Sequence, residues 1–212
     1  MSLLPFNECS SIMVSGATSS GKTIWTYKVL QNLNVFKQPP EAIMYCYGVW
    51  QELFEDIERL PNMTMKQGLP SNLDDWAPEA KHRLIIIDDL MDKVVNNLEM
   101  SLLFTQGCHH KHISIIYITQ NLYLQGKYSR TISLNTQYMV LFRSLRDVSQ
   151  ISILGRQLFP GNSKVLTQVY NDVMKKPYTY LIVDSSPHCN YQYRLRTNIF
   201  PDEYPIVYVP KV

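Results

Sequence analysis

The residues best suited to chemistry form the segment GATSSGKT at positions 16–23. This segment fits the pattern GxxxxGK(S/T) and stands between an apolar run and a helix-compatible segment, which is the context that the pattern requires. Such a loop points backbone N–H groups at a phosphate, its lysine reaches the outer phosphate oxygens, and its last hydroxyl binds Mg²⁺. We therefore expect a site for ATP and Mg²⁺, rather than an ordinary glycine- and serine-rich turn, at Gly16, Ala17, Thr18, Ser19, Ser20, Gly21, Lys22 and Thr23.

Two adjacent carboxylates, Asp88 and Asp89, end the apolar run RLIIIDD at positions 83–89. At the end of a buried strand, the first carboxylate can hold the Mg²⁺ shell and the second can orient or polarise an attacking water. The alternative is a strand that ends in an ordinary turn, where Asp is common. The phosphate loop favours the chemical interpretation, so we expect Asp88 to bind the metal and Asp89 to be catalytic.

A third polar side chain, Gln120, follows the apolar run ISIIYIT at positions 113–119. The carboxyl ends of parallel strands face one ligand crevice, so Gln120 can sense the γ-phosphate or the attacking water. The alternative is a glutamine that only solvates the end of a strand.

Short apolar runs that alternate with helix-compatible segments predict the elements that position these residues. Helices are expected at 22–33, 49–60 and 96–108, and a helical pair at 146–158 and 163–176. This alternation is typical of an α/β fold with a mainly parallel sheet. We expect one domain over 1–212, with a core at about 10–185, a loop over the sheet at 61–78 and an extended arm at about 187–212. The six predicted strands are 10–16, 42–48, 83–89, 113–119, 138–143 and 178–184.

The composition fits a globular domain with one sizeable core, since 45% of the 212 residues are hydrophobic and 18% are charged. Without a basic leader or an apolar run of the ~20 residues that a membrane helix needs, we expect a soluble, intracellular protein. The four scattered cysteines are expected to be free thiols. The net charge is −5 over residues 1–110 and +7 over residues 111–212, an asymmetry that permits contact with nucleic acid.

Several motifs together resemble the genome-packaging ATPases of the HerA/FtsK superfamily, in particular the poxvirus-type, adintovirus and Polinton-type enzymes. These motifs are the phosphate loop, LIIIDDLMD, FTQGCHHKHI, SIIYITQNL and GKYSRTISLNTQYMVLFRSLRDVSQISILGRQLFPG, and they span roughly residues 12–184. The resemblance implies a RecA-like P-loop NTPase core that hydrolyses ATP. It also implies that Lys22 and Thr23 bind nucleotide and Mg²⁺, Asp88 the metal, Asp89 the water, and Gln120 acts as a sensor. Superfamily members often carry Glu where Asp89 stands, so the shorter side chain needs help from backbone placement.

The resemblance further implies a homo-oligomeric ring that threads double-stranded DNA without regard to its sequence. Capsid or portal proteins are the implied partners, no membrane is involved, and the site of action is virion assembly in the nucleus or cytoplasm of a host cell or the virion itself. Two alternatives stay open. One is a P-loop kinase for a nucleotide or small molecule, and the other is a nucleotide-dependent assembly factor without translocation.

Basic residues supply the remaining candidates. A ring ATPase needs a cation from the neighbouring subunit, and Arg143 or Arg146 in LFRSLRD can provide it, with Arg156 behind them. The alternative for Arg146 is an ion pair with Asp147 or a helix cap.

Lys127 and Arg130 in LQGKYSRT are candidates for contacts to the DNA backbone, although a solvated basic loop fits them as well. The cluster CHHKH at 108–112 suggests zinc, but adjacent histidines rarely converge on one tetrahedral ion. We therefore predict no zinc site there.

Overall fold

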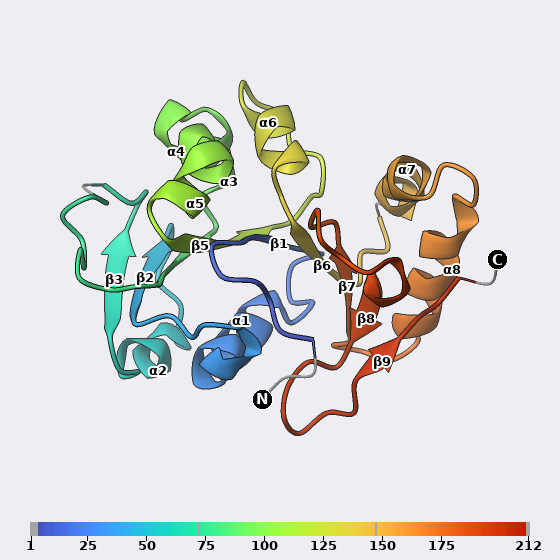
Figure 1. The fold of residues 1–212 in the computed structure, drawn as a ribbon, viewed down its shortest axis with the longest axis horizontal. Helices are drawn as coiled ribbons and strands as arrows, with labels where there is room; N and C mark the ends of the chain where they lie inside the picture. The colour runs from blue at the N-terminus through green and yellow to red at the C-terminus, as the bar shows by residue number, and fades with distance from the viewer. Residues whose placement is uncertain (1–3, 72, 147, 211–212) are drawn as a thin grey trace.

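The computed structural model describes residues 4–71, 73–146 and 148–210, which fold around a nine-stranded sheet (Figure 1). The order of the strands is β3-β2-β4-β5-β1-β6-β7-β8-β9. Neighbouring strands are parallel from β3 to β6 and antiparallel from β6 to β9. The strands are β1 Ser11–Ser15, β2 Ala42–Tyr47, β3 Met63–Gln67, β4 Arg83–Asp88, β5 Ile113–Thr119, β6 Tyr138–Phe142, β7 Tyr180–Asp184, β8 Leu195–Thr197 and β9 Ile206–Val207.

Helices cover both faces of the sheet, which confirms the predicted α/β fold (Figure 1). Alternate residues of β4 show the two layers, because Leu84 and Ile86 pack in one hydrophobic cluster with α1 and α2, while Ile85 and Ile87 pack in the other with α3–α8. The α-helices are α1 Lys22–Gln31, α2 Phe54–Glu58, α3 Met91–Val95, α4 Leu98–Leu102, α5 Cys108–His110, α6 Ser129–Leu134, α7 Val148–Leu158 and α8 Lys164–Val173.

All six predicted strands and the helical pair α7 and α8 are confirmed, but two predicted helices differ from the observed ones. The segment 49–60 forms only the short α2, because its first residues make a loop beyond β2. The segment 96–108 is interrupted by a π-helical turn, Leu103–Gly107, between α4 and α5. Two 3₁₀ turns, η1 Leu33–Val35 and η3 Tyr191–Tyr193, complete the elements.

The prediction of a loop over 61–78 is wrong for its first part, where β3 pairs in parallel with β2. Met63 and Met65 pack against the cluster that contains α1 and α2, while Thr64 and Gln67 are exposed. An edge strand of this kind buries little surface, so its residues alternate only weakly between apolar and polar. The neighbouring Pro and Gly therefore favoured the prediction of a loop.

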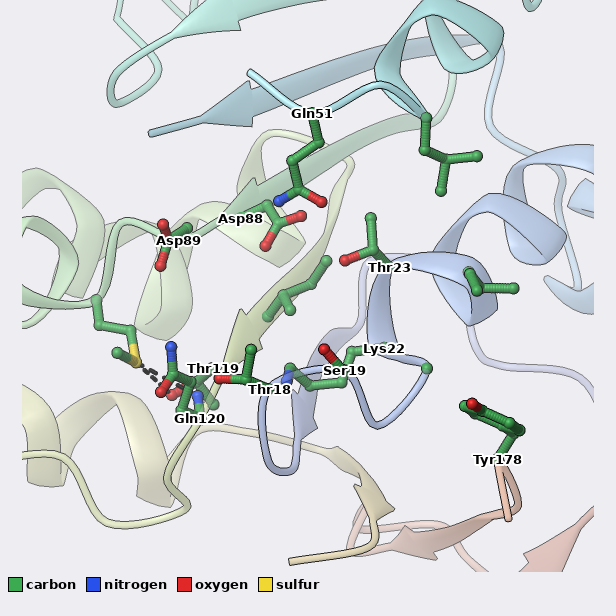
Figure 2. A pocket seen from close by; sticks show the side chains of 15 residues that line it. Thr18, Ser19, Lys22, Thr23, Gln51, Asp88, Asp89, Thr119, Gln120 and Tyr178 are labelled. Carbon is green, nitrogen blue, oxygen red and sulfur yellow. Dashed lines mark hydrogen bonds between the residues drawn. The ribbon is translucent and has the colours of Figure 1, made fainter. Parts of the chain in front are cut away.

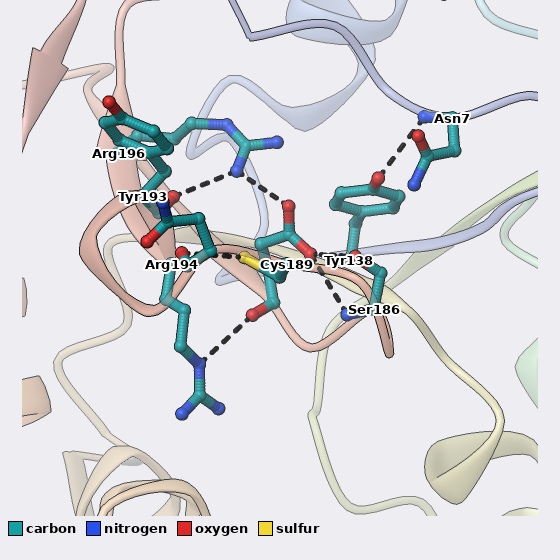
Figure 3. Close-up of polar contacts among 9 residues, drawn as sticks. Asn7, Tyr138, Ser186, Cys189, Tyr193, Arg194 and Arg196 are labelled. Atoms are coloured by element: carbon teal, nitrogen blue, oxygen red, sulfur yellow. Dashed lines mark hydrogen bonds and ion pairs between the residues drawn. The ribbon is translucent and has the colours of Figure 1, made fainter.

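The segment that was expected as an extended arm, about 187–212, holds β8 and β9, which pair with the sheet. Arg196 on β8 is buried and donates hydrogen bonds to Asp184 Oδ2 (2.8 Å) and to the carbonyl of Tyr193 (3.1 Å), as Figure 3 shows. The Arg194 Nε atom donates to the carbonyl oxygen of Asp184 (3.4 Å). These contacts tie the C-terminal segment to β7 rather than leaving it free.

His82 allows a prediction about pH. Its ring is 1% exposed, and its nitrogens lie 2.6 Å from the Gln38 carbonyl and 2.8 Å from Ser114 Oγ. Burial lowers the pKa of His82 in the folded protein. As the pH falls below about 6.5, the unfolded chain therefore binds more protons at this histidine than the folded protein does, and the free energy of unfolding decreases.

We expect a slope of up to about 1.4 kcal/mol per pH unit from this histidine, measured by urea unfolding between pH 7 and pH 5. In His82→Gln the slope should be smaller, because the glutamine amide does not titrate. An unchanged slope in that variant would show that other groups control the acid response.

Candidate functional site

A cavity of about 710 Å³ lies where β1, β4 and β5, three neighbouring strands, reach their carboxyl ends. The phosphate loop follows β1, Asp88 ends β4 with Asp89 directly after it, and Gln120 follows β5, so the predicted residues do converge. Figure 2 shows Thr23, Asp88 and Gln51 directing their side chains toward a common space. Its lining is Thr18, Ser19, Gly21, Lys22, Thr23, Ile24, Gln51, Leu53, Asp88, Asp89, Met91, Ile118, Thr119, Gln120 and Tyr178.

Glycine is required at both fixed positions of the phosphate loop. A Cβ on Gly16 would lie 2.5 Å from Cβ of Phe142 on β6, so the loop passes too close to the neighbouring strand for a side chain. Gly21 has φ 104°, a conformation that glycine adopts without steric cost. The loop is also anchored to its neighbours, since Gly16 N–H donates to the Thr119 carbonyl and Ala17 N–H to the Arg143 carbonyl.

Lys22 is buried, and its ammonium donates to the carbonyls of Gly16 and Ala17, both at 2.8 Å. Burial lowers the pKa of Lys22, while the negative charges of Asp88 and Asp89 act in the opposite direction. The ammonium therefore lies inside the loop and within the electrostatic reach of both carboxylates.

Asp88 is 5% exposed and accepts a hydrogen bond from the Tyr45 hydroxyl at 2.8 Å. Burial raises the pKa of this carboxyl, and the bond from Tyr45 opposes the shift. Tyr45 lies on β2, the strand next to β4, and its own pKa is raised by burial and by Asp88. The tyrosine thus holds one carboxylate oxygen of Asp88 in a fixed direction.

Asp89 is exposed to the cavity and has φ 56°, in the left-handed region. Its carbonyl oxygen lies only 2.6 Å from where a Cβ on Gly48 would be, so the backbone here needs glycine as its neighbour. Gln120 lines the same cavity beside Thr119, whose hydroxyl contacts Met91 Sδ at 3.1 Å. Asp89 therefore leaves β4 in a left-handed conformation at the edge of the cavity.

Arg143 and Arg146 border the phosphate loop of their own chain in a second hollow of about 790 Å³. This hollow adjoins the first cavity, because Thr18, Gln120 and Tyr178 line both. No ion pair of either arginine occurs among the described residues, and Asp147 lies outside that part of the chain. Arg156 lines a separate hollow between α7 and α8.

Lys127 and Arg130 are exposed and do not line the cavity of the phosphate loop. The loop of Lys127 is held by Asn96, whose Oδ1 accepts from its N–H at 3.2 Å, and the lysine ammonium lies 5.2 Å from the centre of the Tyr128 ring. Arg130 belongs to the first turn of α6.

The described side chains of the CHHKH segment diverge. Cys108 is buried in the core, His110 lines a hollow with Asp74, and His112 Nδ1 lies 4.0 Å from Cys9 Sγ. The side chain of His109 lies outside the described part of the chain. Cys9, Cys46, Cys108 and Cys189 are free thiols, as predicted.

Tyr45, Gln51 and Tyr178 are among the residues of the site that the sequence analysis did not predict. Gln51 had a signal, because it follows β2, and β2 ends at the same edge of the sheet as β4. Tyr178 precedes β7, which is antiparallel to β6, so the start of β7 lies at this edge. Nothing in the sequence distinguishes an antiparallel β7 from a parallel one.

Comparisons with known proteins confirm the fold. The genome packaging NTPase B204 from Sulfolobus turreted icosahedral virus 2, in complex with ATP-gammaS, aligns with a TM-score of 0.55 and 13% identity over 96% of this chain and 98% of that chain. The same protein in complex with sulfate gives 0.53 and 13% over 96% and 97%. No protein-family model matches the sequence, and no curated protein matches it. The predicted RecA-like P-loop NTPase fold is therefore confirmed, while the HerA/FtsK resemblance stays a prediction.

Among the described residues, no helix combines the length and the apolar character that crossing a membrane requires.

Proposed function

We propose that this protein hydrolyses ATP to move double-stranded DNA and so packages a viral or virus-like genome, acting as a homo-oligomeric ring. The observation that carries the ATPase part is the convergence of Lys22, Asp88, Asp89 and Gln120 on one cavity beside the phosphate loop. The packaging part rests on the sequence resemblance and on the likeness in fold, over nearly the whole of both chains, to a genome packaging NTPase.

The residues fit ATP and Mg²⁺. Ser20 Oγ in the loop is buried and has no hydrogen-bond partner among the described residues, which a phosphate oxygen would supply. Lys22 holds loop carbonyls that it can exchange for phosphate oxygens. The Thr23 hydroxyl and the Asp88 carboxylate are hard oxygen donors of the kind that Mg²⁺ prefers. When bound, ATP provides the phosphoryl group and Mg²⁺ neutralises charge that develops on it.

The side chains that line or support the cavity then have separate roles. The ammonium of Lys22 stabilises negative charge on the outer phosphates, and Tyr45 keeps Asp88 oriented toward Thr23. Tyr45 bonds to Asp88 and not to Asp89. Asp89 orients a water and accepts its proton, and Gln120 holds that water in position. We expect the left-handed backbone at Asp89 to make up for a side chain that is one methylene shorter than Glu.

Arg143 and Arg146 add positive charge beside the phosphate loop, either in their own chain or across a ring contact. Lys127 and Arg130 contact the DNA backbone. Capsid or portal proteins are the partners of the ring at the site of virion assembly. A nucleotide kinase is the second candidate, and a nucleotide-dependent assembly factor without translocation the third.

The test is ATP hydrolysis by the purified protein with and without long double-stranded DNA at several salt concentrations. We expect DNA to stimulate hydrolysis and the stimulation to weaken with salt, because contacts to phosphates release counterions. A double variant, Lys127→Ala with Arg130→Ala, should bind DNA with less dependence on salt. The negative slope of log DNA affinity against log salt concentration should become shallower by roughly two.

The matched control is Lys37→Ala with Lys81→Ala, which removes two exposed lysines that precede β2 and β4, and it should keep the slope. Hydrolysis that DNA does not change would contradict translocation and favour the assembly factor. Phosphate transferred to an added acceptor would favour the kinase.

A further inference from the structure

Tyr178 lies in the turn between α8 and β7 with an unusual backbone. Its φ is 59°, in the left-handed region that bulky residues rarely adopt, and its side chain is 72% exposed. Backbone outliers of this kind persist only when the surroundings hold them, and they gather at functional sites. An exposed aromatic ring in such a conformation needs a reason other than packing.

The surrounding turn holds Tyr178 firmly. The Thr179 hydroxyl donates to the carbonyls of Val173 (2.7 Å) and Lys176 (2.9 Å), and Tyr180 is buried in the core. Pro177 restricts the backbone just before the tyrosine. The residues that follow Tyr178 are therefore held by hydrogen bonds and by burial in the core.

The ring covers the outer side of the phosphate loop. A Cβ on Gly21 would lie 3.4 Å from Cδ1 of Tyr178, and Figure 2 shows Tyr178 on the far side of the loop from Asp89. Ile24, which is 57% exposed, lines the same cavity one residue after Thr23. The cavity thus has a charged end at Asp88 and Asp89 and an apolar end at Ile24 and Tyr178.

We propose that Tyr178 is the platform on which the base of the bound nucleotide stacks, with Ile24 beside it. This inference rests on the proposed function, because it takes the ligand to be a nucleoside triphosphate. When the phosphates occupy the loop and the reacting end faces Asp89, the base must lie toward the opposite end of the cavity. An aromatic side chain offers its face to any base, so Tyr178 supplies affinity for the base.

The test is isothermal titration calorimetry with two probes, a non-hydrolysable ATP analogue and tripolyphosphate, which lacks base and ribose. Tyr178→Ala should weaken binding of the ATP analogue by roughly 5- to 150-fold and leave tripolyphosphate unchanged, while Tyr178→Phe should keep both. Tyr204→Ala is the matched control, because Tyr204 is 90% exposed and lies outside the cavity. Both truncated side chains are exposed, so the variants should fold as the parent does.

Three results would overturn the assignment. Equal affinity of Tyr178→Ala and the parent for the ATP analogue would show that the ring does not contact the base. An equal loss for both probes would show that Tyr178 only shapes the phosphate loop. A parent protein that binds neither probe would overturn the proposed function itself, since tripolyphosphate reports on the loop alone.

Discussion

The Lys22→Ala variant is expected to lose ATP hydrolysis by roughly 10²- to 10³-fold in kcat, the usual cost of one charge-stabilising donor in a closed site. The reason is geometric, because the Lys22 ammonium lies inside the loop, bonded to the carbonyls of Gly16 and Ala17, where the outer phosphates would bind. The measurement is phosphate release at saturating ATP and Mg²⁺.

Lys28→Ala is the matched control, since Lys28 lies on the same helix, α1, but does not line the cavity of the phosphate loop. Its ammonium lies 4.0 Å from Asp202 and 5.5 Å from the centre of the Phe200 ring. This variant should hydrolyse ATP at the parent rate. If Lys22→Ala kept activity within a few-fold of the parent while Lys28→Ala behaved normally, the phosphate loop would not be the site of hydrolysis.

The two carboxylates are expected to give separable losses. Asp88→Asn should weaken the dependence of binding on Mg²⁺ and lower hydrolysis by roughly 10²- to 10³-fold, because the amide cannot supply the negative charge. Asp89→Asn should bind ATP normally but lower kcat by roughly 10²- to 10⁴-fold, because an amide cannot accept a proton from water. The measurements are nucleotide affinity with and without Mg²⁺ and kcat for each variant.

Both substitutions to Asn should leave the local structure unchanged. Asn tolerates the left-handed conformation that Asp89 adopts, and at position 88 the amide oxygen can still accept the Tyr45 hydroxyl. Asp89→Glu is the informative control, since a carboxylate one methylene longer should retain most of the activity. Full activity of Asp89→Asn would exclude Asp89 as the base and leave water positioning to Gln120.

Much of the fold followed from patterns that are local in the sequence. Apolar runs such as those of β4 and β5 are buried on both faces, so they read as central strands without any knowledge of the fold. The edge strand β3 escaped prediction because it is only half covered. The pairing of β8 and β9 also escaped it, since their contacts join residues to distant partners, as Arg196 does to Asp184.

The sequence by itself determined the phosphate loop and the two carboxylates, because the chemistry of Gly16, Lys22, Thr23, Asp88 and Asp89 depends on spacing along the chain and on a strand before the motif. Only the tertiary structure decided which residues surround them. Neighbours such as Tyr45, Arg143 and Tyr178 reach the site through the order and direction of strands, above all the antiparallel β7. Strand order is set by the packing of the whole sheet, which no local pattern records.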